Sequence, residues 1–241
     1  MKDLRRKHPG RKGIGIILLS GFFICACNAL SARSSNARTG HADIVRDQLG
    51  YLPTNFLSVS AWKSNGEEPV AIKTYPLNGG AKRRQSKAEV PGQAVNAPFP
   101  TLYWLTCPEI SKAIADLERR GCIQDFEATL KENPEFAERL VQCHKDYAKE
   151  RWSCLTSEDQ ELLSQDNPSI LRMRTMMKES GISGTNFTMH LDGDGTNVAS
   201  IKCLHAHYAH FRSTMESDCS PNPVGEMIHS TLEKEFPDLV L

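Results

Sequence analysis

The sequence lacks a long hydrophobic run, an excess of charge and an internal repeat. Its most apolar stretch, residues 14–27, is shorter than the roughly 20 residues that a membrane-spanning helix needs, so a multispan membrane protein is excluded. Basic and acidic residues balance at 29 each, which gives no sign of a highly charged, disordered chain. A length of 241 residues then favours one soluble globular domain with appendages.

The N-terminal segment has the order of a targeting signal. Six Lys and Arg side chains come first, an apolar run follows, and small residues end the segment near position 32. We therefore expect residues 1–32 to be a signal peptide or, if uncleaved, a membrane anchor that provides the chain's one membrane contact. Residues 33–45, which contain two Arg and two Ser, are expected to be a transit-like or disordered leader.

These two segments set the predicted localisation. A signal peptide followed by a transit-like stretch is similar to the bipartite presequences of algae with complex plastids. The chain is thus predicted to enter the secretory pathway and to reach a plastid, or to be secreted or lumenal. A membrane-anchored protein is the alternative.

The charge of the remaining chain bears on its partners. Removal of residues 1–32 takes away six basic and one acidic residue and leaves 23 Lys and Arg against 28 Asp and Glu. Binding to nucleic acid gains its affinity from neutralising phosphates, so an acidic body makes nucleic acid an unsuitable partner. A protein or a small molecule remains as the partner.

The first half of the domain has the signals of a small antiparallel sheet. Residues 56–62 alternate in polarity and residues 70–75 are β-branched and aromatic, with Asn-Gly between the two runs. Residues 99–105 are a third candidate strand. A stretch rich in Gly, Ser and Pro, residues 78–98, is expected to be a loop insertion.

The second half is predicted to be helical. Thr106 followed by Glu109 is the pattern of a capping box, so a helix should begin with Thr106 as its N-cap. Asn133 opens a longer helix whose apolar face includes His144. Further helices are expected at 123–131, at 156–178 as a pair broken at 167–168, at 201–211 and at 226–235. The predicted fold class is α+β, with a small antiparallel N-terminal sheet packed on a mostly helical C-terminal part, in one domain over residues 46–235.

Thiol and imidazole side chains are concentrated at Cys203, His205, His207 and His210. In a continuous helix, Cys203, His207 and His210 share one face. If Cys203 instead precedes the first turn, it converges with His205 and His210. Zinc accepts thiolate and imidazole in a tetrahedral array, although the spacing is not that of a standard zinc finger. The alternative is a set of buried, hydrogen-bonded core histidines and packed thiols.

Two distant residues can complete such a site. Cys107 or His144 would supply the fourth ligand of a zinc ion. Cys107 also has a catalytic interpretation, because a thiol at a helix N-terminus has its pKa lowered towards the reactive thiolate. An enzyme would then use Cys107 or a pocket histidine such as His144 as nucleophile or general base. A buried small residue at a strand-to-helix corner is the alternative for Cys107.

Several motifs resemble the bacterial domain of unknown function 501 family over roughly residues 46–230. They are PFPTLYWLTCP at 98–108, Leu-Glu at 117–118, KCLH at 202–205 with Ala-His at 209–210, and NPVGE at 222–226. The resemblance implies a fold unit and no assigned reaction. The polar residues that match the family's motif positions are Cys107, His144, Asp146, Tyr147, Lys202, Cys203, His205, His210, Asn222 and Glu226.

One departure from the family bears on the metal site. Many bacterial relatives carry Cys-x-Cys-Gly after the first strand, where this chain has Lys-Ser-Asn-Gly at 63–66. A metal site in this chain is thereby confined to Cys107, Cys203, His205 and His210. The sequence thus favours a domain that binds zinc or another ligand in a Cys/His pocket, with an enzyme or a protein-interaction module as alternatives.

Overall fold

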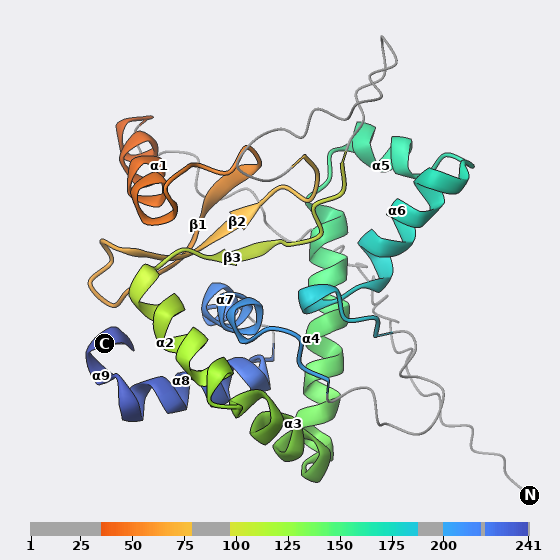
Figure 1. The fold of residues 1–241 in the computed structure, drawn as a ribbon. Helices are drawn as coiled ribbons and strands as arrows, with labels where there is room; N and C mark the ends of the chain where they lie inside the picture. The colour runs from red at the N-terminus through yellow and green to blue at the C-terminus, as the bar shows by residue number, and fades with distance from the viewer. Residues whose placement is uncertain (1–34, 79–96, 188–199, 218–219, 241) are drawn as a thin grey trace, which may run out of the picture. The chain divides into compact units, whose positions relative to one another are not determined.

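The computed structural model describes residues 35–78, 97–187, 200–217 and 220–240, and a three-stranded antiparallel sheet lies at its N-terminal side (Figure 1). The strands are β1 (Phe56–Trp62), β2 (Pro69–Thr74) and β3 (Tyr103–Leu105), in the order β1-β2-β3. Both pairs are antiparallel. The predicted hairpin is confirmed. The third strand is shorter than predicted, because prolines at 98 and 100 provide no N–H for a sheet ladder.

Helices account for most of the rest of the described chain. Their bounds are α1 Ser35–Leu49, α2 Pro108–Arg119, α3 Cys122–Glu132, α4 Pro134–Ser153, α5 Ser157–Leu163, α6 Pro168–Glu179, α7 Leu204–Thr214, α8 Pro223–Glu235 and α9 Pro237–Val240, with a 3-10 turn η1 at Ile182–Gly184. The α+β class is therefore confirmed, as is the helix pair broken at residues 167–168.

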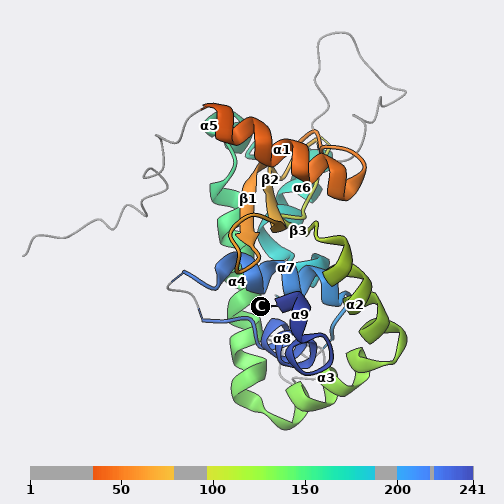
Figure 2. The same cartoon turned by 90° about the vertical axis from the view of Figure 1, so that its left-hand side faces the viewer.

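Helix α7 lies at the centre of the fold. It packs against all three strands on one side and against α8 on the other, while α1 contacts β2 (Figure 2). The core side chains of α7 follow one another almost without interruption, at Tyr208, Ala209, His210 and Phe211. A helix in such a position must bury nearly its whole circumference, which is why its histidines enter the core.

Asparagine side chains start three of the helices. Asn133 accepts from the Phe136 N–H at the start of α4, and Asn222 accepts from the N–H groups of residues 224 and 225 at the start of α8. The same device at residue 167 begins α6. The capping box predicted at Thr106 is wrong. The N-cap of α2 is Cys107, without a side-chain cap, because the Thr106 N–H donates to the Val70 carbonyl and extends the sheet.

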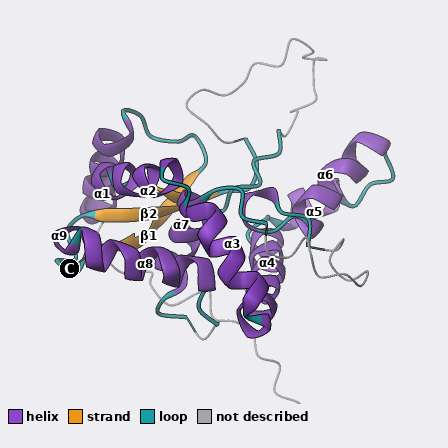
Figure 3. Cartoon of the chain, turned by 60° about the horizontal axis from the view of Figure 1, so that its bottom comes forward, coloured by secondary structure: helices purple, strands orange, loops and turns teal. Residues whose placement is uncertain are grey.

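Helices α5 and α6 pack beside α4 (Figure 3), and a small second hydrophobic cluster joins their Leu163 and Met177 to Leu77 and Leu155. Arg151 links α4 to α6. Its fully buried guanidinium donates to the carbonyls of Pro100, Met176, Met177 and Ser180. Since the last three carbonyls belong to the end of α6, a cation there also complements the helix dipole.

Most of the targeting predictions concern residues outside the described ranges. The predicted signal at 1–32 lies outside the described residues, as does most of the predicted insertion, residues 79–96. Residues 35–45, within the predicted leader, are helical in α1. Within the described ranges, none of the helices combines the length and the apolar character that crossing a membrane requires.

Candidate functional site

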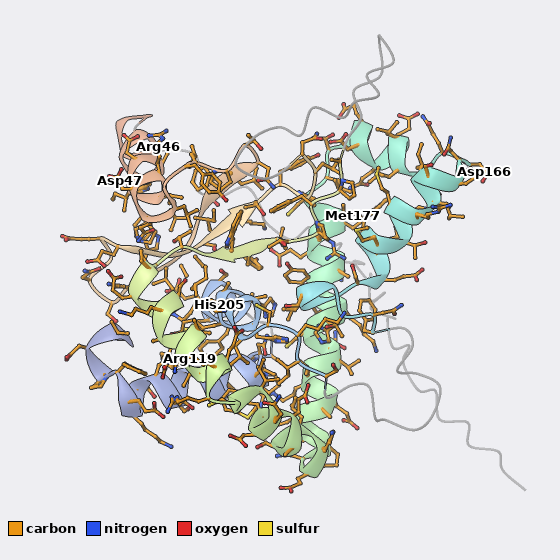
Figure 4. All side chains as sticks on the ribbon, viewed as in Figure 1. Arg46, Asp47, Arg119, Asp166, Met177 and His205 are labelled. Carbon is orange, nitrogen blue, oxygen red and sulfur yellow. The ribbon has the colours of Figure 1, made fainter. Side chains whose placement is uncertain are left out.

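Three metal-binding residue types converge where α7 begins beside α2. Cys203 is the N-cap of α7 in extended conformation. His205, labelled in Figure 4, lies in the first turn of α7. Glu118 approaches from α2. One ligand atom from each residue lies within 4.8 Å of the other two. All three residues are partly buried, with side-chain exposures of 29% for His205 and 28% for Glu118, so the group remains accessible from solvent.

Hydrogen bonds fix the orientation of the His205 ring. Its Nε2 lies 3.0 Å from the Ser111 carbonyl oxygen, which can only accept, so Nε2 carries a proton. The other nitrogen, Nδ1, faces Glu118 Oε1 at 3.2 Å. The Cys203 thiol, chiefly, raises the pKa of His205 to about 9, and Glu118 adds to this rise while burial opposes it. Two potential anions, the Glu118 carboxylate and the Cys203 thiol, therefore lie close to this imidazole.

Glu118 has a second, structural role. The same oxygen, Oε1, accepts the backbone N–H of Leu204 at 2.7 Å and so satisfies one of the free N–H groups at the start of α7. The carboxylate is thus held in place independently of His205. The sequence prediction missed Glu118 as a ligand, although the Leu-Glu pair at 117–118 belongs to the family-like motifs and was a usable signal.

His207 and His210 lie on another side of α7, in a buried network with Asn222. The Asn222 Oδ1 accepts from the N–H groups of residues 224 and 225, which orients its amide. Its Nδ2 then donates to His207 Nδ1 and to His210 Nδ1, each at 3.2 Å. Burial lowers the pKa of His207 to about 4 and that of His210 to about 3. Both imidazoles are therefore neutral, with the proton on Nε2.

This network opposes metal binding by His210. Coordination through Nε2 would require the ring proton to move to Nδ1, where the Asn222 amide already points a donor. Coordination through Nδ1 would displace that amide. The predicted core-histidine alternative therefore describes the environment of His210 better than the ligand prediction does.

His144 of α4 belongs to the same buried region. Its Nδ1 accepts from the Ile182 N–H at 3.1 Å, and its ring centroid lies 5.8 Å from that of His207. Gly181 packs so closely on His144 that a Cβ at residue 181 would lie 2.5 Å from the imidazole. The imidazole is 1% exposed, which leaves it no open path to a substrate in this conformation.

Cys107 lies in a different corner, between β3 and α2. Its thiol is buried and donates to Glu109 Oε2 at 3.1 Å, and Lys63 lies close to the same carboxylate. Burial, chiefly, raises the pKa of Cys107 above its ordinary value. This is opposite to the lowering that the sequence predicted from the helix N-terminus, because desolvation outweighs the helix dipole.

The four predicted metal ligands are therefore only partly brought together. Cys203 and His205 meet, and Glu118 joins them. Cys107 and His210 take no part in this group, which is the single set of three or more close Cys, His, Asp or Glu ligand atoms found among the described residues. Of the predicted pocket, Cys203 and His205 alone meet in the group with Glu118 at the N-terminus of α7.

Comparison with known proteins gives one match. The family model described as "Protein of unknown function (DUF501)" matches residues 60–230. Neither a curated protein nor a solved structure matches the chain.

Proposed function

The chain belongs to the DUF501 family, whose description assigns no activity, and we propose that this member binds a divalent metal ion, most suitably zinc, through Glu118, Cys203 and His205. The convergence of the three ligand atoms within 4.8 Å carries the proposal. Thiolate, imidazole and carboxylate are the three side-chain groups from which zinc sites are made.

The surroundings of His205 support a metal. Histidines that bind metals commonly donate their second ring N–H to a carbonyl or carboxylate, which orients the ring and fixes its tautomer. His205 makes such a bond to the Ser111 carbonyl. Its Nδ1 is thereby directed at Glu118, and a ligand atom of Cys203 lies within 4.8 Å of ligand atoms of both residues.

The geometry distinguishes a metal site from a catalytic triad. In a Cys-His-Glu triad, the thiol and the carboxylate bond to opposite nitrogens of the imidazole, so that a proton can pass between them. Here Glu118 lies at Nδ1, and the ligand atom of Cys203 lies within 4.8 Å of the atoms of Glu118 and His205. Nε2 is occupied by the Ser111 carbonyl. The arrangement suits a shared cation better than a proton relay.

The ligand count bears on the type of metal site. Structural zinc sites have four protein ligands, whereas three protein ligands and an open position are typical of catalytic zinc. The group offers three residues that are partly exposed to solvent. We propose that an exogenous ligand or water occupies the fourth position, which keeps the enzyme alternative open for this metal rather than for Cys107.

The test is the metal content and metal-dependent stability of the full chain, purified without an affinity tag that binds metals. We expect about one equivalent of zinc per chain, with a thermal midpoint that falls on chelation and recovers with added zinc, since binding to the folded state alone stabilises it. Cys203→Ser should lose the metal. Cys122→Ser, which changes a partly buried thiol of α3, is the matched control and should keep it.

A second interpretation predicts a different result. If the group is only an ion pair between protonated His205 and Glu118, the purified chain should contain well below one equivalent of any metal. Chelators and zinc would then leave the thermal midpoint unchanged. That outcome would reject the metal-binding proposal.

A further inference from the structure

A separate polar cluster joins the sheet to the end of α4. Lys73 of β2 and Tyr103 of β3 are register partners. Lys73 Nζ donates to Glu150 Oε1 at 2.7 Å, and Tyr103 OH donates to the same oxygen at 2.6 Å. Glu150 of α4 thus holds the lysine ammonium at a fixed position beside the helix.

Helix geometry places Cys154 next to Glu150, the residue that holds the ammonium. The Cys154 N–H donates to the Glu150 carbonyl at 3.0 Å, and its backbone is helical, with φ −75° and ψ −17°. Residues four apart on a helix are neighbours on its surface, so the thiol of Cys154 lies one turn beyond the carboxylate that holds Lys73. Burial opposes the rise in the pKa of Lys73, whereas Glu150 and, after it, the Cys154 thiol raise that pKa.

The cluster is reachable from solvent. The side chain of Lys73 is 24% exposed and that of Glu150 is 35% exposed, and Cys154 is of intermediate burial. An adjacent ammonium favours the thiolate form, which is the form that reacts with oxidants. A small oxidant can therefore reach a thiol that already has an amine beside it.

We propose that Cys154 and Lys73 form a redox cross-link, in which a peroxide oxidises the Cys154 thiol and the Lys73 amine captures the product in a sulfur–nitrogen bond. The cross-link would covalently join β2 to the C-terminal end of α4. It involves none of the residues of the metal group and does not depend on metal binding.

The reaction balances with one molecule of hydrogen peroxide. The thiolate attacks one peroxide oxygen, the O–O bond breaks, and the products are the sulfenic acid and hydroxide, so that sulfur is oxidised and peroxide is reduced. Hydroxide takes a proton from the Lys73 ammonium and becomes water. The amine lone pair then attacks sulfur, the S–O bond breaks, and the hydroxyl group leaves with an amine proton as a second water.

The test uses the full-length reduced chain treated with one equivalent of hydrogen peroxide. We expect a product about 2 Da lighter than the reduced chain, since two hydrogens are lost, with one thiol consumed rather than the two that a disulfide consumes. Protease digestion should yield a linked pair of peptides that contain Lys73 and Cys154. Reduction with a thiol should restore the separate peptides.

Two variants and dimedone, a reagent that reacts with sulfenic acids, provide the controls. Lys73→Arg keeps the positive charge but prevents the capture step, so the sulfenic acid should persist at Cys154 and react with dimedone. Cys122→Ser should form the linked peptide as the unmodified chain does. If the unmodified chain gives no linked peptide, and its Cys154 reacts with dimedone to the same extent as in Lys73→Arg, the proposal is wrong.

Discussion

At the scale of single residues, the buried imidazole of His210 is the clearest source of pH dependence. Its pKa is lowered to about 3 by burial and by the nearby His207, whereas an unfolded histidine titrates near 6.5. Between these two values the unfolded chain binds a proton that the folded chain excludes. The contribution of His210 to the free energy of unfolding is therefore fully present above about pH 6.5. It is lost as the pH falls towards the pKa that His210 has in the folded chain.

This argument gives a measurable difference between variants. From pH 7 to pH 4.5, we expect His210→Gln to lose about 2 to 3 kcal/mol less of its free energy of unfolding than the unmodified chain. Urea denaturation across that range measures it. His41→Gln, which changes a histidine packed on Trp62, should follow the unmodified chain, and parallel curves for all three proteins would contradict the assignment.

Asn222 provides a second check on the same network. Asn222→Asp keeps an oxygen for the α8 cap but replaces the amide that donates to His207 and His210. The new carboxylate oxygen can only accept, and it then faces the Nδ1 atoms of His207 and His210, which also accept. At least one of the two imidazoles must therefore take a proton at Nδ1. Imidazole ¹⁵N shifts should report Nε2–H tautomers in the unmodified chain and a changed state in the variant.

The group of Glu118, Cys203 and His205 was partly predictable from the sequence, for a geometric reason. Cys203 and His205 are close in sequence, so their proximity needed only a helix start between them. His205 and His210 are five residues apart, which places them about 140° apart around a helix, and His207 is only about 60° from His210. Glu118 could not be found by spacing, since it is brought near by the packing of α2 on α7.

At the scale of elements, Arg151 joins α6 to the rest of the fold. Within the part of the chain that the structure describes, its buried guanidinium bonds to carbonyls of α6 and of the segment before β3 rather than to a carboxylate. Burial lowers its pKa to about 10. A planar group with five donors can satisfy several carbonyls at once, whereas a lysine ammonium cannot reach the same set.

We therefore expect Arg151→Lys to lower the free energy of unfolding by about 2 to 4 kcal/mol, because carbonyls at the end of α6 lose their donors while a charge stays buried. Hydrogen exchange should accelerate most in α5 and α6. Arg172→Lys, on the exposed side of α6, is the matched control and should be within 0.5 kcal/mol of the unmodified chain, on the order expected for surface changes. Equal effects for the two variants would show that Arg151 has no linking role.

How well the start of each helix could be predicted depends on whether its capping partners are close in the sequence. The start of α4 at its Asn-Pro pair was predicted, because the cap and its N–H partner are within three residues. The start of α8 was predicted three residues late, at 226, although an Asn-Pro pair also begins that helix. The start of α2 was not predictable, since the Thr106 N–H is taken by Val70 of a strand 36 residues earlier. Local patterns therefore predicted the strands and most of the helices, though not α1 or α9, and long-range hydrogen bonds decided where α2 begins.

At the scale of the whole molecule, one hydrophobic core connects the sheet with the helices below it. Leu102 beside β3 and Leu232 of α8 are both fully buried in this cluster, together with residues of α2 and α7. A core shared in this way predicts that the sheet and α8 unfold together, because neither retains an apolar surface to pack against without α7.

Leu232→Ala tests this cooperativity. We expect it to lower the free energy of unfolding by about 2 to 5 kcal/mol, the range for a buried leucine, and to accelerate hydrogen exchange in β2 as well as in α8. Leu171→Ala, at a position that is 45% exposed, should change stability by less than about 0.5 kcal/mol. Faster hydrogen exchange confined to α8 would contradict this prediction, because it would mean that α8 opens alone. The sheet would then be stabilised by α2 and α7 without α8.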